Sequence, residues 1–199
     1  MSIKIGKHFE VFRSFETINA GDRIPIILGS GRAFGSGEHE TTSSCLEELE
    51  TIPIIQDSKV LDVGCGTGIL SLAAARMGAQ YVTAVDPDPR AIKTTVKNIQ
   101  LNHVEKKIIP LEGELAIVED HDFDVIISNL YGDILLNIAR ELSKRLKPGG
   151  YLLLSGILYE YTFDLKTVFI QSGYDLLKAR YLEEYTTLLF KKEEIQVFE

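Results

Sequence analysis

The sequence predicts an α/β fold, with a mostly parallel sheet covered by helices and an antiparallel hairpin at its C-terminal end. Strand-like and helix-like segments alternate through most of the chain after residue 58, which is typical of βαβ units. The strand-like segments are continuous apolar runs, as expected for strands buried on both faces. The last two follow each other with no helix between them, and this favours a hairpin.

Hydrophobic spacing and chain breakers give the individual elements. Ile92, Val96 and Ile99 lie at i, i+4 and i+7, so they share one face of a helix. A Pro-Gly-Gly run at 148–150 is expected to end the helix before it. Strands are predicted at 59–63, 81–85, 108–111, 125–128, 151–154, 174–181 and 185–191, and helices at 69–77, 89–101, 134–146 and 162–171.

A glycine-rich segment divides the chain into two predicted parts. Residues 28–37, LGSGRAFGSG, form its densest run of chain breakers. Before it, apolar residues at 3–5, 9–12 and 24–27 predict short strands, with a turn at 19–22. We therefore expect an N-terminal arm of short strands over residues 1–30 and a second domain over 31–199.

The acidic composition disfavours nucleic-acid binding. The chain has 29 acidic and 21 basic residues and a formal net charge of -8. Nucleic-acid binding is disfavoured because phosphate contacts normally need a basic face. The acidity suits a basic partner, or serves only solubility.

Cysteine and histidine usage predicts an intracellular protein without a metal. Cys45 and Cys65 are far apart, and the four histidines lack ligand spacing, which argues against a disulfide scaffold and a zinc site. The N-terminus does not read as a signal peptide, and no apolar run approaches the length of a membrane span. A cytoplasmic location and no membrane association are expected.

The loop after the first strand of the regular region carries the main functional signal. Its sequence is GCGTG at 64–68, and a helix follows it. Glycines allow a turn to approach a ligand closely, and a helix N-terminus adds amide donors. Ile69 stands where the NAD-binding GxGxxG pattern has its third glycine, and no P-loop lysine is present. Taken alone, the loop is equally consistent with a tight strand-to-helix turn.

Asp86 strengthens the prediction of a nucleoside-containing cofactor. It ends the next strand and lies 22 positions after Gly64, where a carboxylate in a wound sheet accepts ribose hydroxyls. A helix cap is the alternative role. We assign that role to Asp88, which precedes Pro89 at the first helical position.

Four segments together resemble known methyltransferases. Residues 60–68 with Asp86 are similar to the first two motifs of class I S-adenosylmethionine (AdoMet) methyltransferases. Residues 31–42, GRAFGSGEHETT, resemble the GxAFGTGxHxTT signature of the PrmA family, which methylates the large-subunit ribosomal protein eleven. Residues 129–131, NLY, and 154–158, LSGIL, resemble two further motifs of that family. The resemblance implies a Rossmann-like class I methyltransferase with a seven-stranded sheet.

The resemblance also implies roles for particular residues. The family contacts AdoMet at positions that match Thr42, Gly64, Asp86 and Asn129 here, Phe34 would cover the cofactor and Gly66 would complete the loop. The family's targets are lysine ε-amines and N-terminal α-amines of proteins.

Several alternatives for function remain open at this point. Family members carry a substrate-recruiting domain before the signature, whereas about 30 residues precede it here. A methyltransferase acting on a ribosomal protein is one candidate. Because the preceding segment is short, a methyltransferase of the same fold acting on a small molecule or RNA is the alternative. A non-catalytic AdoMet-binding interaction module is the alternative of another class.

Asn129 is the candidate catalytic residue. It ends the fourth strand, where its carbonyl oxygen would accept a hydrogen bond from the incoming amine and orient the lone pair. The alternative is a turn-forming asparagine. His39 is interpreted as structural, since a single histidine is more often a hydrogen-bonded structural residue, and Glu38 and Glu40 either attract a cationic substrate or are solvated loop charges.

Overall fold

The computed structural model of the chain describes residues 2–14, 16–29 and 37–194. The elements, in chain order, are β1 (Ile3–Ile5), β2 (Phe9–Arg13), β3 (Ile24–Leu28), α1 (Glu40–Leu49), β4 (Lys59–Val63), α2 (Ile69–Arg76), β5 (Tyr81–Asp86), α3 (Pro89–Leu101), β6 (Ile108–Glu112), the short helix η1 (Leu115–Ile117), β7 (Phe123–Asn129), α4 (Gly132–Arg145), β8 (Leu146–Leu158), α5 (Tyr159–Gln171), β9 (Tyr174–Tyr181) and β10 (Tyr185–Lys192).

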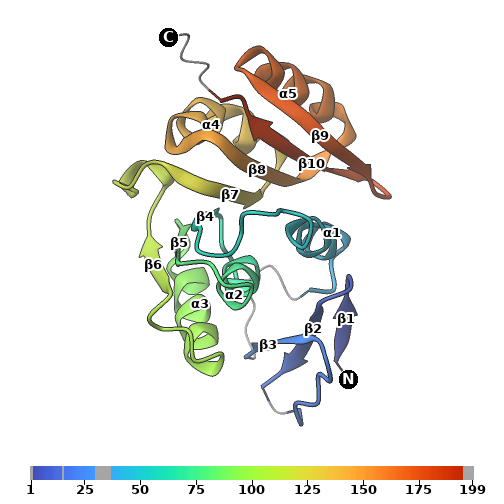
Figure 1. Cartoon of the computed structure of the whole chain (residues 1–199), viewed down its shortest axis with the longest axis vertical. Helices are drawn as coiled ribbons and strands as arrows, with labels where there is room; N and C mark the ends of the chain where they lie inside the picture. Colours follow the sequence, from blue (N-terminus) through green and yellow to red (C-terminus); the bar gives the residue numbers. More distant parts are fainter. Residues whose placement is uncertain (1, 15, 30–36, 195–199) are drawn as a thin grey trace.

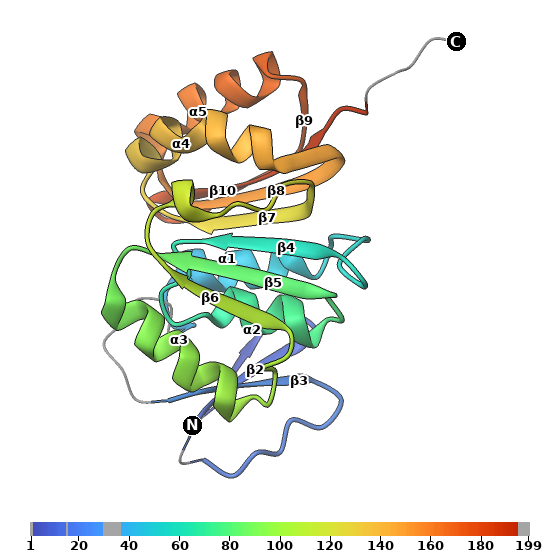
Figure 2. The ribbon, with the colours of Figure 1, turned by 90° about the vertical axis from the view of Figure 1, so that its left-hand side faces the viewer.

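The main sheet has seven strands in the order β6-β5-β4-β7-β8-β10-β9. Strands β4 to β8 are parallel, and β10 runs antiparallel to both β8 and β9. Figure 2 shows these strands lying side by side. The predicted mostly parallel sheet with a C-terminal hairpin is confirmed. Because the chain leaves β4 toward one edge and returns at β7 on its other side, the carboxyl ends of these two strands form the expected ligand-binding position.

Helices bury both faces of this sheet. Val60 of β4 belongs to one apolar cluster together with Leu46 of α1 and Leu72 of α2. Its neighbour Leu61 belongs to a second cluster with Leu135 of α4 and residues of α5. Successive residues of a strand point to opposite faces, so the continuous apolar runs in the sequence reflect two separate cores, one on each side of the sheet.

Strands β1 to β3 form a small second sheet at the end of the molecule opposite α5 (Figure 1). Strand β1 is antiparallel to β2, and β2 is parallel to β3. Phe9 and Ile26 share an apolar cluster with α1 and α2. The amide of Ile27 also donates to Asn102 Oδ1 after α3, at 2.9 Å. The arm thus packs on the main core, and the domain boundary at residue 30 stays a prediction.

The structure corrects the predicted boundary between the helix at 134–146 and the strand at 151–154. Helix α4 begins at Gly132 and ends at Arg145, and β8 starts at Leu146, before the Pro-Gly-Gly run that was expected to separate helix from strand. Pairing of Leu146 with Phe123 of β7 draws this segment into the sheet, and the register then shifts before Val125. A tertiary contact therefore overrides the local breaker signal.

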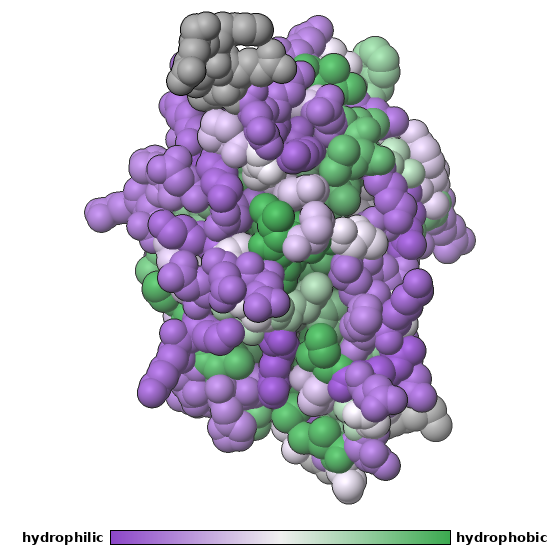
Figure 3. Space-filling model, in the orientation of Figure 1, coloured by the Kyte–Doolittle hydropathy of each residue, from purple (hydrophilic) through white to green (hydrophobic). Residues whose placement is uncertain are grey.

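Hydrophilic residues cover most of the face seen in Figure 3, and hydrophobic residues form smaller patches among them. Within the described residues, no helix has the length and apolarity needed to cross a membrane.

Candidate functional site

The loop between β4 and α2 has two positions that require glycine. Gly64 and Gly68 have φ of 75° and 78°, in the left-handed region that other residues avoid. A Cβ on Gly64 would lie 2.5 Å from Leu130 Cδ2, and one on Gly68 would lie 2.9 Å from Thr95 Cγ2. From α3, the Thr95 hydroxyl donates to the carbonyl of Gly66 at 2.9 Å. The loop is therefore held close to β7 on one side and to α3 on the other.

Asp86 lies beside this loop at the end of β5. Its Oδ2 accepts the amide of Gly66 at 2.9 Å, and its Oδ1 accepts the amide of Asp88 at 2.9 Å. Asp88 in turn accepts the amide of Arg90 and is the N-cap of α3, with Pro89 in its first turn. The predicted cap at Asp88 is confirmed. The ribose-binding role of Asp86 stays a prediction.

Asn129 lies at the end of β7, next to Ser155 of β8. Its Nδ2 donates to the hydroxyls of Thr41 and Thr42 of α1, at 3.3 and 3.4 Å. Its Oδ1 is buried and has no hydrogen-bond partner within the described part of the chain. A Cβ on the neighbouring Gly156 would lie 2.9 Å from this oxygen. The side chain is thus fixed through its nitrogen, which leaves its oxygen as an available acceptor.

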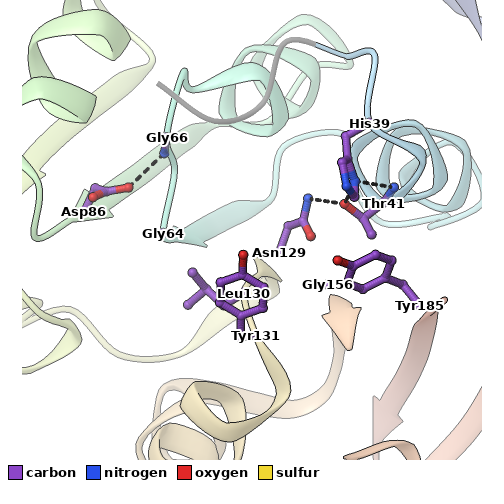
Figure 4. A pocket seen from close by; sticks show the side chains of 10 residues that line it. All are labelled: His39, Thr41, Gly64, Gly66, Asp86, Asn129, Leu130, Tyr131, Gly156 and Tyr185. Atoms are coloured by element: carbon purple, nitrogen blue, oxygen red, sulfur yellow. Dashed lines mark hydrogen bonds between the residues drawn. The ribbon is translucent and has the colours of Figure 1, made fainter. Parts of the chain in front are cut away.

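Two cavities meet at these residues. The first has a volume of about 270 Å³, and Figure 4 shows its lining residues: His39, Thr41, Gly64, Gly66, Asp86, Asn129, Leu130, Tyr131, Gly156 and Tyr185. The second, of about 470 Å³, also contacts Gly64, Asp86 and Leu130, and extends past β6 to Gly113, Glu114 and Leu115 and along α4. Together they form one elongated site across the carboxyl ends of β6, β5, β4 and β7.

The structure brings most of the predicted site residues together. Gly64, Gly66, Asp86 and Asn129 line the first cavity. Thr42 is buried behind it, with its hydroxyl against the amide of Asn129. Phe34 lies outside the described residues, as does the first half of the signature at 31–42. Their predicted contacts with a cofactor stay predictions.

Several other residues around the first cavity, among them Thr41, Gly156 and Tyr185, had no predicted role. Thr41 and Gly156 stand inside the motifs at 31–42 and 154–158, so the resemblance could have singled them out. Tyr185 starts β10, and its pairing with Leu158 of β8 returns it to this edge of the sheet. Local sequence carries no signal for that return.

His39 has a structural role in this arrangement. Its ring accepts the amide of Thr41 at 3.3 Å as the N-cap of α1, and it meets the Tyr185 ring edge-on at 5.5 Å. These contacts agree with the structural interpretation. Of its acidic neighbours, Glu38 pairs with Arg13 at 2.8 Å, and Glu40 accepts the amide of Glu183.

The electrostatics of the site disfavour thiol chemistry at Cys65. Burial raises the pKa of the Cys65 thiol well above its usual range, and the nearby carboxylate of Asp62 raises it further. The thiol therefore stays protonated and unreactive at neutral pH. No group of three or more His, Cys, Asp or Glu side chains within the described residues is arranged to hold a metal ion.

The fold is that of a class I methyltransferase. Its sheet order, with a glycine loop after β4 and an acidic residue ending β5, is the arrangement that the sequence motifs implied. Residues 2–193 match the family model described as ribosomal protein L11 methyltransferase (PrmA). The chain belongs to this family, and the resemblance seen in the sequence is confirmed.

Individual relatives agree with the family assignment. The chain is 37% identical over 187 residues to the ribosomal protein L11 methyltransferase of Methylococcus capsulatus, covering 94% of this chain and 62% of the relative. It is 37% identical over 197 residues to that of Geobacter sp., covering 96% and 63%. The chain thus spans less than two thirds of the length of these relatives.

A solved structure shares nearly the whole described fold. The crystal structure of a ribosomal protein L11 methylase from Lactobacillus delbrueckii subsp. bulgaricus superposes with a TM-score of 0.89 at 26% sequence identity. The superposition covers 97% of this chain and 99% of that one.

Proposed function

We propose that this chain is an AdoMet-dependent N-methyltransferase that modifies amines of a protein, either lysine ε-amines or an N-terminal α-amine. The observation that carries the proposal is the buried, unpartnered Oδ1 of Asn129, at the edge of a cavity that the glycine loop and Asp86 also line. The names of the relatives make ribosomal protein L11 the first substrate to test.

The residues around the two cavities suit AdoMet. The carboxylate of Asp86 keeps lone pairs beyond those that accept the two amides, so it can accept ribose hydroxyls. Gly64 lines both cavities, so the backbone of the loop can approach a ligand closely. The apolar side chain of Leu115 and the backbone of Gly113 line the second cavity, where an adenine ring would pack.

The side chains of the chain then act on the acceptor amine. AdoMet held by these residues would supply a methyl group, activated on a sulfonium, for transfer to the amine nitrogen. Asn129 Oδ1 accepts a hydrogen bond from the amine N–H and so aims its lone pair. Leu130 and the aromatic rings of Tyr131 and Tyr185 line the cavity around it. Burial among them disfavours the ammonium form and helps the amine to lose its proton to water.

The alternatives make different predictions for the acceptor. A methyltransferase acting on RNA would need basic residues around the cavity, and none of the described residues that line it is a lysine or arginine. A small-molecule acceptor would fit a cavity of about 270 Å³ equally well. A non-catalytic module would bind AdoMet without turnover. Fractionating the methylated products separates these cases.

The test uses purified chain, radiolabelled AdoMet and two acceptors: purified ribosomal protein L11 and a cell extract. Label is followed into protein, RNA and small-molecule fractions, and labelled protein is mapped by mass spectrometry. We expect label in protein, on lysine or an N-terminal amine. Label confined to RNA or metabolites would contradict the proposed substrate class, and AdoMet binding with no transfer to any fraction would favour the binding module.

The role of Asn129 is tested with Asn129→Ala. Loss of a positioning contact at a reacting group costs about a hundredfold in rate, so we expect kcat to fall by about that factor. Asn19→Ala is the matched control, because Asn19 is exposed in the connection between β2 and β3. AdoMet affinity is measured by calorimetry for both variants, so that a defect in binding is separated from one in transfer. Full turnover by Asn129→Ala would refute the assigned role.

A further inference from the structure

Three separate segments meet at the edge of the sheet that holds the site. Helix α4 starts just after β7, and α5 starts directly after β8. The β9–β10 turn reaches the same edge because Tyr185 pairs with Leu158, the last residue of β8. Gly132 of α4 packs against Tyr161 of α5. Residues 131–133, 159–163 and 181–185 thus form one continuous surface beside the first cavity.

This surface is unusually aromatic. Its three segments contain five of the eight tyrosines of the chain, as well as Phe163. We call the exposed members Tyr131, Tyr159, Phe163 and Tyr181 the aromatic edge. Phe163 is 76% exposed, Tyr131 63% and Tyr181 60%. The rings of Tyr159 and Tyr181 lie 6.1 Å apart, and Tyr131 also lines the cavity. Such a cluster of exposed aromatic rings is typical of a protein-binding surface.

The three segments that form this surface carry only negative charge. Its segments carry Asp133, Glu160, Glu183 and Glu184 and no lysine or arginine. All four acidic residues are exposed. The carboxylates of Glu160, Glu183 and Glu184 form no hydrogen bond or ion pair with any described residue of the chain. They are available to a partner.

One lysine of the chain already shows how an ammonium group sits on this surface. Lys166 Nζ lies 5.5 Å from the centroid of the Tyr181 ring and 3.0 Å from its hydroxyl. The face of an aromatic ring attracts cations, and nearby carboxylates add to that attraction.

We propose that the aromatic edge docks a lysine- and arginine-bearing segment of the protein substrate and so delivers the neighbouring amine to the cavity. This inference rests on the proposed function and specifies how its substrate is recognised. Tyr131 links the docking surface to the cavity, so one bound segment occupies both. A second copy of this chain fits less well, because each copy carries a net charge of -8.

The first experiment neutralises the acidic residues of the surface. The variant is Glu160→Gln/Glu183→Gln/Glu184→Gln. Its control is Glu105→Gln/Glu119→Gln/Asp120→Asn, which makes the same charge change at exposed sites before β6 and β7, on the opposite edge of the sheet. We expect KM for ribosomal protein L11 to rise about tenfold in the first variant, at about two- to threefold for each charge. The rise shrinks at high salt, and kcat and AdoMet affinity stay unchanged.

The second experiment removes an aromatic ring. Phe163→Ala is compared with Ile170→Ala, which lies two turns further along the same face of α5 and is 51% exposed. Phe163→Ala should raise KM several-fold and Ile170→Ala should not. A KM that either surface variant leaves within twofold of its control overturns the proposal. A dimer in sedimentation that Phe163→Ala abolishes also overturns it, in favour of a second copy as the occupant.

A binding measurement separates this inference from the proposed function. Fluorescence anisotropy follows a short labelled peptide of lysine, glycine and serine, and its glutamate counterpart, on the chain with AdoMet present. The docking surface is supported if the lysine peptide binds the wild-type chain and binds the triple glutamine variant more weakly. This result supports docking even if no protein is methylated and the proposed function fails. Equal binding of both peptides overturns the docking surface whatever the enzyme methylates.

Discussion

Asp62 gives the stability of the protein a pH dependence that can be measured. It lies on β4 just before the glycine loop and is 1% exposed. Its Oδ2 accepts the amide and the hydroxyl of Ser71 in α2, at 3.0 and 2.5 Å, and its Oδ1 has no partner within the described residues. Burial raises the pKa of Asp62 from 3.8 to about 6, against the lowering effect of the Ser71 hydrogen bonds, and the charge of Asp86 adds to the rise.

The direction and size of the effect follow from proton linkage. Between pH 3.8 and about 6 the folded chain keeps a proton on Asp62 that the unfolded chain has lost. Stability is therefore greatest below this interval and falls as pH rises through it. The two pKa values correspond to about 3 kcal/mol, at about 1.4 kcal/mol for each pKa unit.

Asp62→Asn removes this titration and keeps a carbonyl oxygen for Ser71. We expect the free energy of unfolding of the variant, minus that of the wild type, to increase by about 3 kcal/mol between about pH 3 and pH 7. Any fixed cost of the amide nitrogen shifts the whole curve and leaves its slope unchanged. Urea unfolding at several pH values measures the difference, and Asp120→Asn at an exposed position is the control. A flat or falling difference would refute the reasoning.

Two further predictions concern the cofactor and the polar core. Asp86→Asn replaces one of two acceptor oxygens by a donor that faces an amide, so AdoMet affinity in calorimetry should fall at least about tenfold; an unchanged affinity would remove Asp86 from the cofactor site. Thr187→Val leaves the buried hydroxyls of Ser44 and Ser155 without their bonds of 2.8 and 2.7 Å. Urea unfolding should show a loss of about 1–3 kcal/mol, which Ser44→Ala should not deepen in the double variant.

The sequence predicts the placement of the glycine loop and Asp86 well because its signals are local. The glycine loop and Asp86 each sit at the end of a strand, and parallel strands bring their carboxyl ends to one edge without further information. The position of Pro89 alone identifies Asp88, rather than Asp86, as the N-cap of the following helix. The structure confirms this cap.

The part of the first cavity around Asn129 depends on contacts between segments that are distant in the sequence, and local sequence patterns do not predict such contacts. Helix α1 was not predicted, since residues 41–44 of its sequence ETTSSCLEEL, two threonines and two serines, have low helix propensity. The His39 cap and the burial of Leu46 and Leu49 stabilise it instead. Tyr185 reaches the cavity through the pairing of β10 with β8, and Gly156 reaches it through the pairing of β8 with β7.

A network of hydroxyl groups behind Asn129 links helix α1 to strands β8 and β10. Thr41 of α1 accepts a hydrogen bond from Asn129, and the next turn of α1 is tied to β10 by Ser44 and Thr187. Thr187 also bonds Ser155, the β8 neighbour of Asn129. The position of α1 therefore sets the orientation of the Asn129 amide, while the glycine loop and Asp86 belong to strands on the other side of β7. A change in this hydroxyl network should consequently lower kcat more than it lowers AdoMet affinity, whereas a change at Asp86 should do the reverse.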